Sequence, residues 1–344
     1  MTADPLLEVS ELRISFRTEL GPTNVLDAVN LAVGRGRIMG LVGESGCGKT
    51  TLARAVLGIL PPNARTEAGT IRFDGLDLLG MERGRIRRKP RRHRIAFIPQ
   101  DPYSAFNPLF RIGDQIMELM KWNSPRRLSN EPGLGALFTP YPRERYRADK
   151  AAAIAMLNEV QIPDPERAFR KLPEQFSGGQ RQRLMIAMAL LMHPGLVIAD
   201  EPTTALDVTI QAQILKLLKS LAKERGVSVL LTTHDLATAY EICDEITVMY
   251  AGQEVETAPV AAFFANPRHP YTARLLECLP DPARQTREMG GESPNMLSPP
   301  AGCRFQPRCA RASAICSQAR PPAVGGRQVV RCFHPHPSPL ETAP

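Results

Sequence analysis

One glycine-rich octapeptide constrains this chain more than any other feature. The letters GESGCGKT fill residues 43–50, between the apolar run of residues 38–42 and a helical pattern over residues 49–57. In a strand–turn–helix unit, such a loop turns its backbone N–H groups and the positive end of the helix toward a phosphate. Lys49 then supplies a charge to the β- and γ-phosphates of a nucleotide, and the Thr50 hydroxyl is a ligand for Mg²⁺. An ordinary glycine turn would leave this Lys-Thr pair unexplained.

A pair of carboxylates follows a second apolar strand pattern. Residues 196–201 read LVIADE, and Asp200 suits a Mg²⁺ partner while Glu201 suits the base that orients the attacking water. Taken alone, the pair is better explained as acids that cap a strand end, so the assignment depends on the phosphate loop. The contacts to nucleotide predicted in that loop and at the start of its helix are Gly43, Ser45, Gly46, Gly48, Lys49, Thr50 and Thr51.

Short apolar strands alternate with longer helical patterns through the first 265 residues. This alternation predicts an α/β fold, in which helices cover both faces of a parallel sheet. Between residues 101 and 176 no buried-strand pattern occurs, so this stretch is predicted to be mostly helical. The predicted strands are residues 38–42, 95–99, 196–200 and 227–233, and a helix is predicted at residues 210–223.

A second glycine-containing motif opens another helix. The string FSGGQRQR fills residues 176–183, and its helical pattern continues to Met192. Ser177 is a favourable N-cap, and Gly178 and Gly179 allow a phosphate to approach the helix N-terminus. Capping alone explains the serine but not the glycine pair, which weakens the start of a helix. We therefore predict a second anion-binding position here.

In this order, the motifs resemble those of the ATP-binding subunits of ABC transporters, over roughly residues 6–265. The resemblance implies an ATPase with an α/β P-loop NTPase core, a parallel or mixed sheet and an inserted helical subdomain. The core would comprise residues 1–100 and 177–265, and the subdomain residues 101–176. By the resemblance alone, Phe16 stacks on adenine, Gln100 is a Mg²⁺ ligand and a catalytic glutamine, Asp207 contacts ATP, and His234 is a catalytic histidine at the γ-phosphate.

The same resemblance implies a composite site between two ATPase chains. A helix N-terminus flanked by glycine favours an anion, and the chain's own phosphate loop already binds one. The predicted partner is a second ABC ATPase subunit, a paralogue that forms a heterodimer with this chain. Lys49 of one chain would hold the ATP. Residues of the other chain would contact the same ATP from the opposite side, namely Ser177, Gly178, Gly179 and Gln180.

Three further strings are similar to the ATPase subunits of dipeptide and oligopeptide importers. They are DPYSAFNP at residues 101–108, where Phe106 replaces the family's leucine, NPRHPYT at residues 266–272 and GCRFQPRC at residues 302–309. The resemblance implies ATP-driven peptide import with two membrane permease subunits and, indirectly, an extracytoplasmic solute-binding protein. Relatives in this subgroup also move nickel and other small solutes.

The chain is expected to lie peripherally on the cytoplasmic face of the membrane. No apolar run approaches the ~18 residues that span a bilayer, and the N-terminal MTADPLLE has no features of a signal peptide. The alternative is a soluble ABC-type ATPase that acts on nucleic acid or ribosomes. Such proteins usually carry two cassettes, long coiled coils or zinc inserts, which this chain lacks. We therefore expect no nucleic-acid partner.

A basic run and the net charge permit a nucleic-acid partner but do not require one. Residues 83–94 include eight Lys or Arg residues, and the whole chain has a formal charge of +8. A solvated loop is the simplest interpretation of the run. Contact with anionic headgroups or a membrane subunit comes next, and contact with nucleic acid is the least favoured.

The C-terminal tail combines many prolines with four cysteines. Residues 266–344 hold 14 of the 32 prolines, which disfavours long helices and predicts a small loop-rich domain. Loops around four thiolates suit a metal cluster, and the resemblance implies a structural 4Fe-4S cluster, with zinc as the alternative. Because the ATP site lies on another domain, nucleotide binding is expected to survive loss of the cluster. The predicted ligands are Cys303, Cys309, Cys316 and Cys332.

Overall fold

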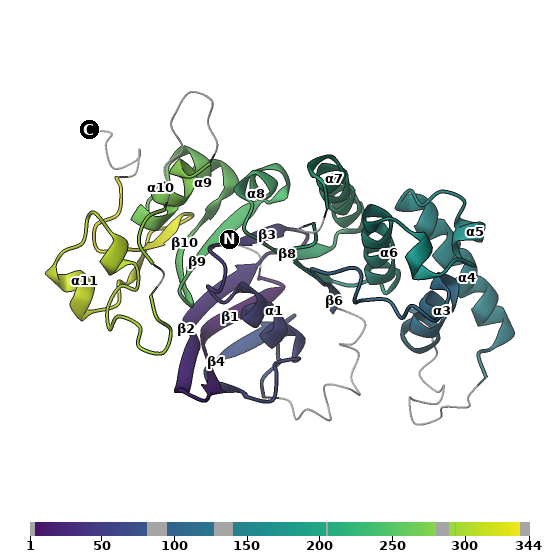
Figure 1. The fold of residues 1–344 in the computed structure, drawn as a ribbon, viewed down its shortest axis with the longest axis horizontal. Coiled ribbons are helices and arrows are strands. Elements are labelled where there is room, and N and C mark those ends of the chain that lie inside the picture. Colours follow the sequence, from purple (N-terminus) through teal and green to yellow (C-terminus); the bar gives the residue numbers. More distant parts are fainter. Residues whose placement is uncertain are drawn as a thin grey trace. The chain divides into compact units, whose positions relative to one another are not determined.

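The fold is taken from a computed structural model, which describes residues 4–80, 95–126, 140–203, 206–279, 289–292 and 294–337. The chain forms two compact units (Figure 1). The first unit contains Met1–Gly80 and Leu230–Pro344, and the second contains Met81–Val229. The basic run at residues 83–94 lies outside the described residues.

An antiparallel sheet forms the N-terminal part of the first unit. Its strands lie in the order β2-β1-β4-β5, and the long hairpin β1–β2 turns between Thr18 and Gly21. The pairing of β1 is interrupted by register shifts, and Glu11 and Ala28 adopt positive φ angles of 49° and 52°. The strands are β1 (Leu7–Thr18), β2 (Gly21–Val33), β4 (Ala64–Phe73) and β5 (Leu76–Asp77).

A second, mixed group of strands in this unit carries the phosphate loop. Strand β3 pairs in parallel with β9, and β9, β10, β12 and β11 then pair antiparallel in that order. The strands are β3 (Ile38–Val42), β9 (Glu245–Tyr250), β10 (Gln253–Pro259), β11 (Ala323–Val324) and β12 (Val329–Arg331). The helices are α1 (Lys49–Leu57), α8 (Leu236–Ile242), α9 (Val260–Ala265), α10 (Pro270–Glu277), η3 (Gln306–Arg308) and α11 (Ala314–Gln318).

The second unit is mainly helical, with strands β6 and β7 paired in parallel. Four of its helices, between residues 112 and 175, fall in residues 101–176, the stretch that was predicted to be mostly helical. Strand β8 (Ser228–Thr233) begins in this unit and ends in the other. The remaining elements are β6 (Ile95–Ile98), β7 (Leu196–Asp200), α3 (Ile112–Asn123), α4 (Arg143–Glu159), α5 (Pro165–Ala168), η2 (Pro173–Gln175), α6 (Gly178–Leu191) and α7 (Val208–Arg225).

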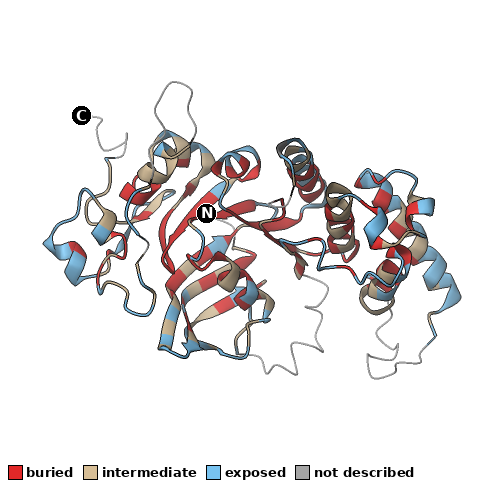
Figure 2. Ribbon diagram, in the orientation of Figure 1, coloured by how far each residue is buried: buried red, intermediate tan, exposed pale blue. Residues whose placement is uncertain are grey.

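Several predicted elements are confirmed, because their apolar runs are buried along their whole length. Strands β3, β7 and β8 contain only buried residues (Figure 2). The ends of β3, α1 and β7 agree with the sequence prediction, whereas α7 extends two residues beyond it at each end. No helix in the described ranges is both long and apolar enough to span a bilayer.

In its described residues the proline-rich tail forms short elements, as its composition predicts. Helix α11 has five residues, and β12 has three. These elements lie in the same compact unit as the N-terminal sheet, since β12 pairs with β10. A separate C-terminal domain beginning at residue 266 therefore stays a prediction.

Candidate nucleotide-binding site

The glycines of the phosphate loop occupy positions that a side chain would obstruct. Gly43 has φ 153°, and a Cβ there would lie 2.2 Å from the backbone oxygen of Met249 in β9. Gly48 has φ 105°, and a Cβ there would lie 2.7 Å from Cδ2 of Leu26. The backbone of the loop therefore packs directly against strands β9 and β2, and glycine allows this close approach because it has no side chain.

Lys49 lies inside the loop and is held by its carbonyl groups. Its ammonium donates to the carbonyl of Gly43 at 2.8 Å and to that of Glu44 at 3.1 Å, and the residue is only 5% exposed. The N-cap of α1 is Gly48, which provides no side chain to bond the first N–H groups of the helix. Those donors and the lysine lie together at the helix N-terminus, which is the arrangement that binds phosphate.

The other loop residues differ in exposure. Ser45 and Gly46 are exposed, whereas Thr50 and Thr51 are half-buried in the first turn of α1. Cys47 is buried, and its burial raises the pKa of the thiol, so it is an uncharged packing residue at neutral pH. The loop thus presents polar groups to solvent at its tip and an apolar base to the strands.

Phe16 and His234 belong to the same unit as the phosphate loop. Phe16 lies in β1, paired with Thr23 and Ala64, and is half-buried. His234 follows β8 directly and is exposed, just before Asp235, which caps α8 through a bond from the N–H of Ala237 at 2.9 Å. Their proposed contacts with adenine and the γ-phosphate stay predictions.

The second unit brings Gln100 and Glu201 together. Nε2 of Gln100 donates to Oε2 of Glu201 at 3.3 Å, although the two residues are far apart in sequence. Glu201 has φ 45°, a left-handed conformation that is uncommon for a residue with a side chain and is typical of functional sites. Asp200 ends β7 beside it and is 5% exposed, whereas Glu201 is half-buried.

The signature helix α6 begins with a complete capping box. The Ser177 hydroxyl accepts from the N–H of Gln180 at 3.3 Å, and the Gln180 side chain accepts from the N–H of Ser177 at 3.1 Å. The glycines also have a packing role, because a Cβ at Gly179 would lie 2.6 Å from Cγ2 of Ile210 in α7. Close approach of α6 and α7 is therefore a second reason for Gly179, beside access for a phosphate.

Asp207 has a local structural task in addition to its predicted contact with ATP. Its carboxylate caps α7 by accepting from the N–H of Ile210 at 3.0 Å. Nearby, the guanidinium of Arg181 lies 4.2 Å from the ring centroid of Tyr103 and donates to the carbonyl of Pro173. These contacts fix the start of α6 against the segment that follows Gln100.

The four tail cysteines line one small pocket of the first unit, together with His269 and His334. The backbone N–H of Cys303 donates to the carbonyl of Cys316 at 2.7 Å, and the N–H of His334 donates to Sγ of Cys332 at 3.3 Å. Burial raises the pKa of the Cys303 and Cys309 thiols and raises that of Cys332 to about 11. Among the described residues, however, no three His, Cys, Asp or Glu side chains are placed to hold a single metal ion.

His269 is a further buried polar residue at this pocket. Its Nδ1 accepts from the N–H of Tyr271 at 3.0 Å, and burial lowers its pKa to about 3, so the ring is neutral with its proton on Nε2. Nε2 is buried and has no hydrogen-bond partner among the described residues. The sequence alone predicts no role for His269, although the residue lies in the NPRHPYT string.

Comparisons with known proteins agree over nearly the whole chain. The family model for the ABC transporter matches residues 26–204, and the model for the oligopeptide/dipeptide transporter C-terminal region matches residues 255–316. The oligopeptide transport ATP-binding protein OppD of Escherichia coli (strain K12) is 39% identical over 322 residues, which are 93% of this chain and 90% of that protein. The dipeptide transport ATP-binding protein DppD of Haemophilus influenzae is also 39% identical, over 96% of each chain.

A solved structure is similar to most of the chain. The dimeric structure of MJ0796, a bacterial ABC transporter cassette, has a TM-score of 0.58 and 25% sequence identity. The match covers 74% of this chain and 98% of that one.

Proposed function

Because this chain belongs to the ABC transporter family, among the oligopeptide and dipeptide transport ATP-binding proteins, we propose that it powers peptide import through separate membrane subunits. Its own reaction is that of an ABC ATPase, the hydrolysis of ATP to ADP and phosphate. The observation that carries the substrate class is the match of residues 255–316 to the C-terminal region of oligopeptide and dipeptide transporters.

Each site residue has a separate proposed role in ATP hydrolysis. Lys49 and the N–H groups at the start of α1 bind the phosphates, and Glu201 orients a water for in-line attack and takes its proton. The hydrogen bond from Gln100 holds the Glu201 carboxylate in place. Thr50, Gln100 and Asp200 would hold Mg²⁺, which supplies neutralisation of phosphate charge when bound. Phe16 would stack on adenine, and His234 would bond the γ-phosphate.

We propose that the signature acts on the ATP of a second ATPase subunit, a paralogue of this chain. Ser177 is exposed at the start of α6, and the N–H of Gly178 and Gly179 belong to its first turn. Such donors suit an anion that another chain presents. The similar MJ0796 cassette is described as dimeric, which supports pairing. Asp207 would lie near the same interface.

An apolar groove of the second unit suits a membrane permease. Its cavity volume is about 1040 Å³, and it lies between β6, α3 and α6. Flexible methionines and Trp122 line it, and Asp114 and Glu118 add negative charge. We propose that it receives a short helix of a permease subunit that carries apolar and basic residues. The chain would then lie peripherally at the cytoplasmic face of the membrane, served by two permeases and, through them, a solute-binding protein.

Substituting Met188 tests the groove. Met188→Arg places a charge among Met185, Met192 and Trp122, so co-purification of the permease subunits from membranes should fall by about tenfold or more. ATP hydrolysis by the isolated chain should change less than twofold. The matched control is Lys219→Met, on an exposed part of α7 away from the groove. Full permease recovery with Met188→Arg would remove the groove from this role.

Uptake of labelled peptides tests the function itself. Cells that lack the chain should lose uptake of labelled di- to pentapeptides, and uptake should return with the wild-type chain but not with Glu201→Gln. Unchanged peptide uptake would reject the substrate class. Salt-dependent binding to RNA or DNA with no permease partners would instead favour the nucleic-acid alternative.

We propose that the four tail cysteines hold a structural 4Fe-4S cluster. Two observations support it. The cysteines share one pocket, and the buried Nε2–H of His269 at that pocket has no acceptor among the described residues, which a cluster sulfur would provide.

Metal analysis tests the cluster directly. Protein purified without oxygen should be brown and contain about four iron and four sulfide per chain. Cys309→Ser should lose most of the iron and make the tail more sensitive to protease, because the described elements around the cysteines are short. Cys278→Ser, at the end of α10 and outside the pocket, should keep the iron. One zinc and no iron in the anaerobic protein would reject the cluster.

A further inference from the structure

Two motifs of the tail contact the same residue of the phosphate loop, Glu44. The guanidinium of Arg308 forms a two-pronged ion pair with Glu44, with its two terminal nitrogens 3.0 and 3.1 Å from the two carboxylate oxygens. The hydroxyl of Tyr271 accepts from the backbone N–H of Glu44 at 3.1 Å. Arg308 directly precedes Cys309, and Tyr271 lies in the NPRHPYT string, so both tail motifs meet at Glu44.

The groups that hold Glu44 are themselves fixed. The Arg308 side chain is only 6% exposed, and it also donates to the Tyr250 hydroxyl at 3.2 Å and to the Gly290 carbonyl at 3.0 Å. Burial acts to lower the pKa of Arg308, but its bonds to Glu44 and Tyr250 outweigh this and raise it, so the charge is permanent. The planar fork of arginine matches a carboxylate in two places, which fixes direction as well as charge.

An aromatic cluster ties the cysteine segment to this contact. Phe305 lies between Cys303 and Arg308 in sequence, and its ring centroid is 5.2 Å from that of Tyr250 and 5.3 Å from that of Tyr271. The Tyr250 and Tyr271 centroids are 4.6 Å apart. The segment that carries the cysteines is therefore packed against the two tyrosines that touch Arg308 and Glu44.

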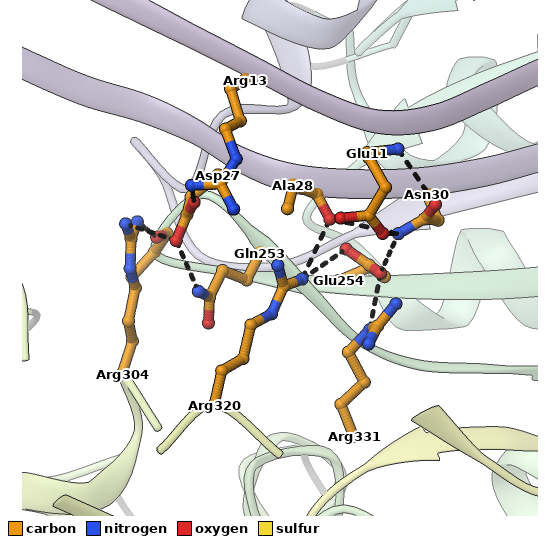
Figure 3. Close-up of polar contacts among 11 residues, drawn as sticks. Glu11, Arg13, Asp27, Ala28, Asn30, Gln253, Glu254, Arg304, Arg320 and Arg331 are labelled. Atoms are coloured by element: carbon orange, nitrogen blue, oxygen red, sulfur yellow. Dashed lines mark hydrogen bonds and ion pairs between the residues drawn. The ribbon is translucent and has the colours of Figure 1, made fainter. Parts of the chain in front are cut away.

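Other tail arginines contact the same unit at different places. Arg304 and Arg320 reach Asp27 and the backbone oxygen of Ala28 in β2, and Arg331 pairs with Glu254 of β10 at 2.7 Å (Figure 3). These anchors attach the tail to strands. Arg308 differs from them because its acidic partner belongs to the phosphate loop.

The charge of Glu44 is unfavourable for the ligand of that loop. Its backbone carbonyl accepts from the Lys49 ammonium, so Glu44 belongs to the loop that is predicted to surround the phosphates. An uncompensated carboxylate there would repel a triphosphate. We propose that Arg308 is a positioning residue for ATP, which neutralises the Glu44 carboxylate and thereby makes nucleotide affinity depend on the cysteine tail. It differs from the expectation that nucleotide binding survives loss of the cluster, and it holds whatever the cysteines bind.

Nucleotide binding to the isolated full-length chain tests the proposal. Arg308→Ala should weaken the Kd of Mg·ATP about five- to tenfold at low salt, less so at high salt, as expected for one uncompensated charge. The loss should fall on KM rather than kcat, because it concerns binding before the chemical step. Arg308→Lys should recover part of the affinity. The double variant Arg308→Ala/Glu44→Gln should recover most of it, because it removes the repelling carboxylate.

Arg331→Ala provides the matched control, since it deletes an arginine–glutamate pair of the same tail that does not reach the phosphate loop. It should leave the Kd within twofold of wild type. Glu44→Gln alone keeps the tail and Arg308 intact, and it should bind ATP at least as tightly as wild type even if Arg308→Ala folds poorly. Wild-type affinity in Arg308→Ala, no recovery in the double variant, or weaker binding in Glu44→Gln would each overturn the proposal.

Discussion

Glu201→Gln is expected to abolish nearly all ATP turnover, by roughly a thousandfold, while ATP still binds. The amide keeps the size of the side chain and can still bond to Gln100, which contacts Glu201 at 3.3 Å. It cannot take a proton from the attacking water. Because hydrolysis then no longer separates the paired subunits, the variant should accumulate as an ATP-bound dimer. Steady-state phosphate release and size-exclusion chromatography with ATP measure the two effects.

A second carboxylate of the same unit supplies the control. Glu166 pairs with Lys150 at 3.6 Å on an exposed surface, so Glu166→Gln removes an equivalent charge without touching the site. Its turnover should stay within twofold of wild type, since exposed ion pairs contribute little. If Glu201→Gln also turned over ATP within a few-fold of wild type, Glu201 could not be the base.

The local elements of the nucleotide site could be predicted from the sequence, because each is determined by residues that lie close together in the chain. An apolar run buried on both faces defines β3 and β7, and a glycine turn followed by Lys-Thr defines the start of α1. The capping box of Ser177 and Gln180 is likewise encoded within four residues. In these segments local preference and tertiary burial favour the same structure.

The N-terminal antiparallel sheet escaped prediction for a physical reason. Register shifts in β1 and the positive φ angles of Glu11 and Ala28 break the alternation of buried and exposed residues by which a strand is recognised. The pairing of β12 with β10 also escaped, because a strand of three residues carries little signal of its own. Its partner lies about seventy residues earlier in the chain.

The contact between Arg308 and Glu44 could not be predicted from the sequence. Both residues lie in recognisable motifs, yet 264 positions separate them. An ion pair between such distant residues leaves no periodicity, and each residue alone reads as an ordinary surface charge. Only the fold, which packs the tail in the same unit as the phosphate loop, brings them together.

Ser177→Arg is expected to lower ATPase activity by about a hundredfold without weakening ATP binding to the isolated chain. The exposed N-cap of α6 would carry a bulky cation where the first N–H groups are proposed to meet the phosphate of a partner chain. The phosphate loop belongs to the other compact unit and keeps its sequence, so the Kd of ATP should stay within twofold. ATP binding is measured below the concentration at which the subunits pair, and turnover is measured above it.

Two further variants distinguish a blocked interface from a damaged helix. Ser177→Ala removes the cap but adds no bulk, so it should cost about 1 kcal/mol of stability and much less activity. Asp164→Arg makes the same kind of change at the N-cap of α5, where the carboxylate accepts from the N–H of Arg167 at 3.2 Å, and it should leave turnover nearly intact. If Ser177→Arg weakened ATP binding in the unpaired chain as much as it lowered turnover, the signature would act within its own subunit, because a contact made only across an interface cannot affect a chain without its partner.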